Sequence, residues 1–235
     1  MSHPQTADGY PAAPRISVIV PTLNEQSCLA ATLDALPLAC GDELIVVDAG
    51  SADGTPDIAR RYTSQVYQGP RGRARQMNHG ARQARGDILL FLHADTLLPA
   101  DGLEAVRQVL QQPGMVGGAF RLRITPATPA LRLVAWGTNL RSRFGGLPYG
   151  DQALFVARRV FEELGGYDDV PFMEDVRLVQ ALRRRGHLTI LPQAVATSGR
   201  RWQRDGVFFT TARNVVLMIL YFCGVQPATL RRWYG

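Results

Sequence analysis

The sequence contains no lysine. All 26 of its Lys and Arg positions are arginines, set against 20 acidic residues, and the formal net charge is +6. A Walker-type phosphate loop and a Schiff-base mechanism both require a lysine, so this absence excludes them. Arginine instead favours bidentate contacts with phosphate or carboxylate groups.

Cysteines and long apolar runs are also scarce. Cys28, Cys40 and Cys223 show neither paired nor metal-type spacing, and such an odd, sparse set is typical of the reducing cytosol. The most apolar stretch, residues 215–225, is about half the ~20 residues that a membrane span needs. Residues 1–14 lack the apolar core of a signal peptide and are expected to form a disordered leader. We therefore expect a cytoplasmic protein, with the inner face of the membrane as a further, peripheral location.

Apolar, β-branched runs alternate with segments of helical spacing in the first half of the chain. Strands are predicted over residues 16–20, 44–47, 65–67 and 88–92, and helices over 25–36, 55–62, 73–85 and 103–110. This alternation indicates βα units on a parallel sheet. The second half is less regular, with strands predicted over 116–124, 153–156, 188–191 and 194–197 and helices over 131–143, 158–164, 174–185, 207–222 and 227–234. The predicted fold class is α/β.

The apolar run 88–92 stops abruptly at His93, Ala94 and Asp95. In open α/β sheets, ligands bind at the carboxyl ends of such strands. Asp95 is therefore a candidate ligand for a divalent cation that would neutralise a diphosphate. The alternative is that Asp95 caps the following helix.

Two more loops meet at this edge if the first, second and fourth strands are neighbours. Residues 21–25 follow the first strand, and residues 48–54 follow the second. Asp48 would accept hydrogen bonds from a base or ribose, and Arg71 or Arg75 would contact phosphate. A single acidic residue in such a loop is more often a cap or a solvated turn. The prediction thus depends on the loops converging.

Four strings in order resemble the motifs of family 2 glycosyltransferases: ISVIVPTLNE, ELIVVDAGSADGT, ARGDILLFLHADT and GGYDDVPFMEDVRLVQALRRRG. Two further strings, GDQALFVARRVFEELGGYD and SGRRWQRDGVFFTTARN, are similar to a narrower branch of small bacterial enzymes. That branch is associated with arsenosugar biosynthesis and with radical-SAM/selenodomain proteins. The resemblance covers about residues 15–235.

This resemblance implies the GT-A fold, a Rossmann-like three-layer sandwich with a central, mostly parallel sheet and a C-terminal helical extension. The glycosyltransferase domain would span residues 15–204, with a nucleotide-binding half over about 15–115 and an acceptor half over about 116–204. Residues 205–235 would form apolar helices that pack on the domain, on a second copy of the chain or on a membrane surface. The aromatic and basic end of this segment is typical of a membrane interface.

The resemblance also implies roles for the residues that match its motifs. A nucleotide-diphosphate sugar would be bound by the loop around the base, by the acid that contacts the base, by the segment leading to the diphosphate and by a phosphate-contacting arginine: Pro21, Leu23, Glu25, Asp48, Arg75, Asn78, Asp95 and Arg201. Asp95 would hold Mn²⁺ or Mg²⁺. Asp175 would be the catalytic base, and Trp202 would stack on the acceptor.

Two departures from the family pattern bear on these roles. His93 replaces the first acid of Asp-X-Asp; a neutral imidazole hydrogen-bonds ribose or ligates a transition metal, but it brings no negative charge. Ser198 replaces the glutamine of the Gln-X-X-Arg-Trp motif found in processive relatives. The second departure argues against polymer synthesis.

The residues around Asp175 support the same chemistry independently. Asp175 follows Glu174 at the start of a predicted helix, where the helix N-terminus keeps a carboxylate ionised, as a general base must be. Simple charge matching at a helix start is the alternative. Glu174 is expected to orient or cap, and Asp151 to contact the donor sugar or acceptor or to form a turn.

The sequence therefore predicts a metal-dependent, inverting and non-processive glycosyltransferase that acts on an unknown hydroxyl acceptor. A nucleotidyltransferase and a catalytically silent relative are the alternatives. Nucleic-acid binding is disfavoured, because aromatic residues are not interleaved with Arg71, Arg73 and Arg75 as a stacking platform requires.

Overall fold

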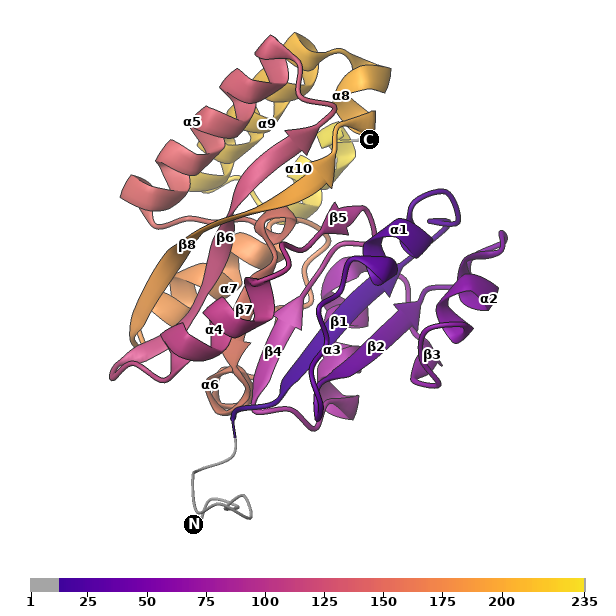
Figure 1. The fold of residues 1–235 in the computed structure, drawn as a ribbon. Coiled ribbons are helices and arrows are strands. Elements are labelled where there is room, and N and C mark those ends of the chain that lie inside the picture. The colour runs from indigo at the N-terminus through magenta and orange to yellow at the C-terminus, as the bar shows by residue number, and fades with distance from the viewer. Residues whose placement is uncertain (1–12, 235) are drawn as a thin grey trace.

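The computed structural model describes residues 13–234, so nearly all of the expected leader lies outside the described residues. One sheet of eight strands runs through the molecule in the order β3-β2-β1-β4-β7-β6-β8-β5 (Figure 1). Its strands are β1 (Ile16–Thr22), β2 (Glu43–Asp48), β3 (Val66–Gln68), β4 (Ile88–Phe91), β5 (Thr96–Leu97), β6 (Met115–Thr125), β7 (Leu154–Ala157) and β8 (His187–Ser198).

Helices cover both faces of this sheet and extend beyond one end of it (Figure 1). The helices are α1 (Leu29–Asp34), α2 (Thr55–Arg60), α3 (Arg73–Gln83), α4 (Gly102–Leu110), α5 (Pro129–Gly145), η1 (Gly150–Gln152), α6 (Arg158–Glu163), α7 (Glu174–Arg183), α8 (Arg200–Asp205), α9 (Val207–Phe222) and α10 (Pro227–Tyr234). The α/β class is therefore confirmed.

The first half of the sheet is parallel. β1 pairs with β2 on one side and with β4 on the other, as the convergence of the loops requires. In this register Thr22 lies opposite Asp48 and Ile19 lies opposite Phe91. The carboxyl ends of the three strands therefore lie side by side, and the loops that follow them share one edge.

β4 shows why the strand sequences are continuously apolar. Leu90 and Leu92 pack into the core that includes α1, α4 and α5, whereas Leu89 and Phe91 pack into the core that includes α3, α6 and α7. Successive side chains point to opposite faces of a strand, so a strand covered on both faces needs an apolar residue at every position. The result is a three-layer sandwich.

Three local expectations were wrong. The helix expected over residues 25–36 begins only at Leu29, because residues 25–28 form a turn in which Cys28 N and Leu29 N donate to Glu25 O. The two strands expected over 188–191 and 194–197 are one strand, β8, whose register shifts between Leu191 and Ala194. This irregularity accommodates Pro192, which has no N–H for the ladder. β5 and α8 were not expected at all.

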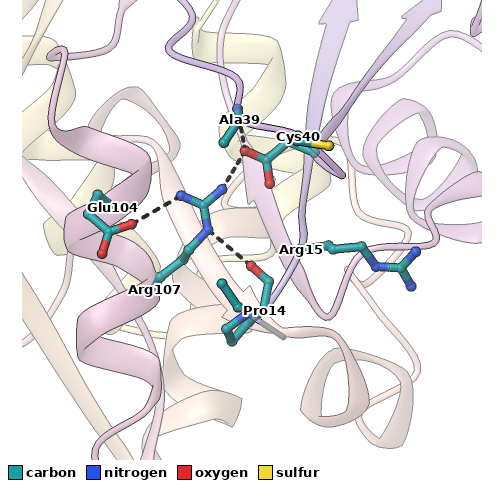
Figure 2. A pocket seen from close by; sticks show the side chains of 8 residues that line it. Pro14, Arg15, Ala39, Cys40, Glu104 and Arg107 are labelled. Atoms are coloured by element: carbon teal, nitrogen blue, oxygen red, sulfur yellow. Dashed lines mark hydrogen bonds and ion pairs between the residues drawn. The ribbon is translucent and has the colours of Figure 1, made fainter. Parts of the chain in front are cut away.

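A buried ion pair joins α4 to Asp42, the residue before β2. The Arg107 guanidinium contacts the Asp42 carboxylate, Glu104 and the Pro14 carbonyl oxygen beside a small cavity (Figure 2). The side chains of Arg107 and Asp42 are 9% and 1% exposed.

Within residues 13–234, no helix has the length and hydropathy needed to cross a bilayer.

Arg107→Ala is expected to lower the free energy of unfolding by about 3 kcal/mol, because it leaves the Asp42 carboxylate buried without a countercharge. Urea denaturation measures this loss. Arg82→Ala, at an exposed position of α3, is the control and should change the free energy by about 0.5 kcal/mol at most. Equal, small effects of both substitutions would contradict the structural role of Arg107.

Candidate active site

The loops after β1 and β2 are joined by hydrogen bonds between backbone and side chains. Asn24 N donates to Ser51 Oγ, and Ala52 N donates to Asn24 Oδ1, both at 2.8 Å. Glu25 N donates to Thr55 Oγ1, also at 2.8 Å. The two loops thus form one rigid wall at the edge of the sheet, as the strand order implied.

Asp48 is largely occupied by its own loop. Its carboxylate accepts hydrogen bonds from Thr22 Oγ1 and Ser51 Oγ, and from the backbone N–H groups of Gly50 and Ser51. The residue is 5% exposed. Asp48 therefore organises the loop in this structure, and a contact with a base or ribose would compete with these bonds.

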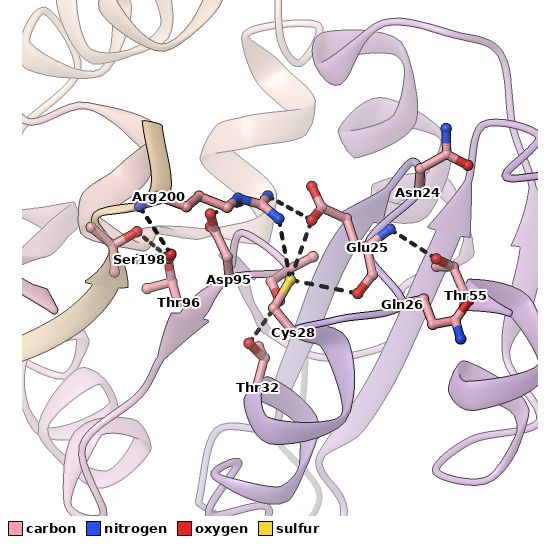
Figure 3. Close-up of polar contacts among 12 residues, drawn as sticks. Asn24, Glu25, Gln26, Cys28, Thr32, Thr55, Asp95, Thr96, Ser198 and Arg200 are labelled. Carbon is pink, nitrogen blue, oxygen red and sulfur yellow. Dashed lines mark hydrogen bonds and ion pairs between the residues drawn. The ribbon is translucent and has the colours of Figure 1, made fainter. Parts of the chain in front are cut away.

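Arg200 links the first loop to Asp95 (Figure 3). Its Nη2 lies 2.6 Å from Glu25 Oε2 and 3.3 Å from Asp95 Oδ2. Arg200 is the first residue of α8, so the chain after β8 reaches across to the loops after β1 and β4. The sequence singled out Arg201 and missed Arg200, since nothing in the string Arg200-Arg201-Trp202 distinguishes the two arginines.

Cys28 belongs to the same cluster but is not a nucleophile. Burial and the adjacent Glu25 carboxylate raise the pKa of the Cys28 thiol to about 12, so the thiol stays protonated. It donates to Glu25 Oε2 at 3.2 Å (Figure 3). The thiol therefore helps to fix the carboxylate that Arg200 contacts.

A second group of polar side chains gathers around Gly150. Gly150 N donates to Asp175 Oδ2 at 3.0 Å. A Cβ atom at Gly150 would lie 2.6 Å from that oxygen and 2.9 Å from His93 Nε2, so only glycine allows the two side chains to approach this closely. Asp175, at the start of α7, therefore lies beside the end of β4.

Arg73 connects this group with Asp95. Its Nη1 lies 3.7 Å from Glu174 Oε1 at the start of α7. Although burial lowers the pKa of Arg73, the carboxylates of Glu174, Asp175, Asp95 and Asp151 together raise it. This influence of all four acids on Arg73 agrees with the packing of Asp175 and His93 around Gly150, since His93 lies two residues before Asp95.

Burial shifts the titration of this site. It raises the pKa of Asp175 to about 7, with Glu174 adding to the rise, and it also raises the pKa of Asp95 and Asp151. It lowers the pKa of His93, as do Arg73 and Arg201, so the imidazole is neutral. Within the described chain, several buried polar atoms here have no hydrogen-bond partner: His93 Nε2, Tyr149 Oη, Asp151 Oδ1, Tyr167 Oη and Asp175 Oδ1. Such atoms are rare in native structures, and a bound ligand would supply their partners.

Two of the residues expected to contact the donor have other partners in this structure. Arg75 makes a bidentate ion pair with Asp169 at 2.7 and 2.9 Å. The Asn78 amide exchanges hydrogen bonds with the Tyr167 backbone. Arg73 lies at the site instead. This position was predictable from helical periodicity, because Arg73 shares a face of α3 with the buried residues Met77 and Gly80.

The other expected residues lie around the same edge. Pro21, expected to begin the loop, is still part of β1, where it pairs with Val47, and Leu23 is in the loop after β1. Leu23 and Arg71 are exposed. Arg201 stacks on the Tyr234 ring with 5.1 Å between Cζ and the ring centroid. Trp202 packs against the core and donates to Thr211 Oγ1 at 3.3 Å.

Backbone strain is concentrated in the loops of this site. Among the described residues other than glycine, three have positive φ: Asn24 (55°), Ala153 (49°) and Met173 (65°). They lie next to Glu25, just after η1 and just before Glu174. Side chains with a Cβ atom seldom adopt this conformation, and it persists where the surroundings impose it, commonly at functional sites.

A divalent cation fits this site only with help from a ligand. Within residues 13–234, no three His, Cys, Asp or Glu side chains are arranged to hold a metal ion. Asp95 offers a partly exposed carboxylate that Arg200 also contacts, and Nε2 of the neutral His93, two residues earlier, has no hydrogen-bond partner. The oxygen atoms of a diphosphate would complete the coordination, so the residues fit a cation that is bound together with a donor.

Comparison with known proteins identifies relatives. Residues 17–164 match the family model Glycosyl transferase family 2. The PGL/p-HBAD biosynthesis glycosyltransferase of Mycobacterium tuberculosis is 42% identical over 172 residues, which cover 67% of this chain and 64% of that protein. The chain thus matches somewhat less than two thirds of the relative's length. The Probable glycosyltransferase YdaM of Bacillus subtilis is 24% identical over 233 residues, covering 86% of this chain and 53% of that protein.

Solved structures share the fold. The mannosyltransferase PcManGT from Pyrobaculum calidifontis, in complex with GDP-Man and Mn²⁺, superposes with a TM-score of 0.69 at 22% identity, covering 94% of this chain and 68% of that one. Glucosyl-3-phosphoglycerate synthase from Mycobacterium tuberculosis, in complex with Mn²⁺ and UDP-Glc, gives a TM-score of 0.63 at 22% identity, covering 90% and 80%. The GT-A fold is therefore confirmed.

Asp175→Asn is expected to stabilise the protein above pH 7. The pKa of Asp175 is about 7 when folded and near 3.8 otherwise, so ionisation costs stability as the pH rises through this window. We expect the Tm of the variant to exceed that of the wild type by about 3 °C or more at pH 8, with the gain vanishing near pH 4.

Asp169→Asn is the matched control. Asp169 is exposed, and its hydrogen bond with Arg75 lowers its pKa, so neutralising it should give no gain at pH 8. If the Tm difference between Asp175→Asn and the wild type did not change with pH, ionisation of Asp175 would not cost the folded state stability.

Proposed function

Because the chain belongs to glycosyltransferase family 2, we propose that it transfers a sugar from a nucleoside diphosphate to an acceptor hydroxyl group, with inversion at the anomeric carbon. The observation that supports this proposal most is the position of Asp175. A Cβ atom at Gly150 would lie 2.6 Å from its Oδ2 and 2.9 Å from Nε2 of His93, two residues before Asp95, although 80 residues separate Asp95 and Asp175 in the chain. Transfer with inversion needs an activated diphosphate on one side of the anomeric carbon and a base on the other.

The donor would be held at the edge formed by the loops after β1, β2 and β4. Pro21, Leu23, Glu25 and Asp48 are proposed to surround the base and ribose. Asp95 would hold Mn²⁺ or Mg²⁺ with the diphosphate, and a bound cation would stabilise the negative charge of the leaving group. The nearby guanidinium groups of Arg73, Arg200 and Arg201 are proposed to add to this stabilisation, since arginine suits phosphate oxygens.

Asp175 is proposed to act as the base. The acceptor oxygen bonds to the anomeric carbon while the bond from that carbon to the diphosphate oxygen breaks. The hydroxyl proton moves to Asp175, and the electron pair leaves with the diphosphate. A carboxylate with a pKa of about 7 accepts a proton far more readily than an ordinary aspartate, yet it is largely ionised just above neutral pH.

The remaining roles are proposals of the same kind. Glu174, ion-paired with Arg73, would orient the base. Asp151 and Trp202 are assigned to the acceptor, and Arg71, Arg75 and Asn78 to the path of the diphosphate. Arg75 would first have to leave Asp169, so Arg73 is the better candidate for phosphate contact.

A further part of the proposal is the kind of acceptor that receives the sugar. We propose a non-processive enzyme, because Ser198 replaces the glutamine of processive relatives. The similarity of the strings GDQALFVARRVFEELGGYD and SGRRWQRDGVFFTTARN to the arsenosugar-associated branch supports a small molecule or a lipid as the acceptor. Helices α9 and α10 are proposed to contact a membrane surface or a second copy of the chain.

A panel of nucleoside diphosphate sugars with Mn²⁺ or Mg²⁺ tests the reaction. One donor should raise the Tm and be slowly hydrolysed, because a ligand that binds only the folded state stabilises it. Asp95→Asn should reduce the rate of diphosphate release by about 100-fold, whereas Asp57→Asn on the surface of α2 should not. Binding of a donor without release of its diphosphate would identify a catalytically silent relative. If no donor binds and none is hydrolysed, the proposed enzymatic function is refuted.

The pH dependence tests the base. The rate of transfer should rise through pH 7 and level off above it, because the ionised carboxylate is the active form. Asp175→Asn should lower kcat by about 1,000-fold while changing donor affinity by less than about threefold. A variant that retains the wild-type pH profile would remove Asp175 from the base role.

A further inference from the structure

Two segments of the chain are rich in arginine and contain no acidic residue. Residues 126–150 include α5, and residues 206–235 include α9 and α10. Neither segment has an Asp or Glu, and together they hold six arginines: Arg132, Arg141, Arg143, Arg213, Arg231 and Arg232. α5 and α9 are in contact and lie at one end of the molecule (Figure 1). All 20 acidic residues lie elsewhere in the chain.

α5 has an exposed apolar face. Leu131, Ala135 and Ser142 are buried against the rest of the protein. The opposite side carries apolar residues at spacings of three and four, which place them in one stripe. These are exposed by 67%, 61%, 43% and 76% at Leu133, Trp136, Leu140 and Phe144, respectively. Large side chains left in water in this way mark a surface that is covered by a partner.

A basic cavity adjoins the end of this stripe. It has a volume of about 350 Å³ and lies where the last turns of α5 and α7 meet the start of β8. Arg143, Phe144, Arg183 and His187 line it, with no acidic side chain among its lining residues. Phe144 belongs to both features, so the apolar stripe and the cavity form one continuous surface.

The α9 helix also has an exposed apolar face. Phe208, Val215, Ile219 and Phe222 repeat at spacings of seven, four and three residues and are all more than half exposed. Thr210 and Leu217 on the other side of the helix are buried. α9 itself carries a single arginine and no acid.

We propose that the stripe Leu133–Trp136–Leu140–Phe144 of α5 docks on an anionic lipid surface, with a headgroup phosphate in the cavity lined by Arg143, Arg183 and His187. An aromatic and aliphatic face beside arginines is the pattern that enters the boundary between headgroups and acyl chains. Anionic lipids attract each basic residue near the surface. The proposal is independent of the transfer reaction and deepens only the suggested membrane contact.

Charge favours lipid over a second copy of the chain. Two copies joined through the α5 stripe would bring Arg143 and Arg183 of each copy together, and no acidic side chain lines the cavity beside them. Like charges across an interface oppose association. An anionic membrane supplies negative charge for the arginines and an apolar layer for the exposed side chains of the stripe.

Vesicle sedimentation of the full-length protein tests the proposal. The protein should pellet with vesicles of mixed phosphatidylcholine and phosphatidylglycerol, remain in solution with phosphatidylcholine alone, and be released by salt. Arg143→Glu and Trp136→Ser should each weaken binding by about tenfold or more. The matched controls are Arg82→Glu and Leu38→Ser, exposed positions in the first half of the chain that should bind as the wild type does.

Each other outcome would overturn the proposal. Failure of the wild type to pellet with anionic vesicles, or equal pelleting with neutral ones, would do so. Stabilisation by inorganic phosphate with no vesicle binding would show a site for free phosphate only. A lipid-free dimer that Trp136→Ser dissociates would show that the face is a contact between copies. Thermal melts of all four variants confirm that they are folded.

Discussion

Attraction between two arginines and the surrounding carboxylates holds the candidate site together. Arg200 spans Glu25 and Asp95, and Arg73 is influenced by Asp95, Asp151, Glu174 and Asp175. These acids come from four separate segments, and without countercharge they would repel one another. The two guanidinium groups allow the ends of β1 and β4, the η1 turn and the start of α7 to meet at one place.

The countercharge is incomplete, and that has chemical consequences. Asp175 keeps a raised pKa, and several polar atoms around Gly150 are buried without partners. Left-handed residues beside the same loops add backbone strain. A fold optimised only for stability would lose these features, so their concentration here is typical of a site arranged for a ligand. The sheet, whose parallel half is covered on both faces, holds the strained loops in place.

Much of this arrangement was predictable from the sequence. Continuous apolar strands and intervening helical spacing predicted the sheet and the convergence of three loops, because parallel strands end at one edge. The identity of the arginines was harder to predict. Arg73 was recoverable from its face on α3, but Arg200 depends on how the chain turns after Ser198, which is a tertiary effect. The late start of α1 has a similar cause, since the Glu25 backbone turns to meet Thr55.

We propose that Asp95 and Asp175 face one bound donor. Anomalous diffraction from crystals grown with Mn²⁺ and the nucleoside diphosphate of the best donor tests it most directly. We expect a manganese peak at Asp95, with the diphosphate against it and the Asp175 carboxylate facing the same space. A peak at other carboxylates, or a nucleotide bound away from the edge formed by β1, β2 and β4, would contradict it.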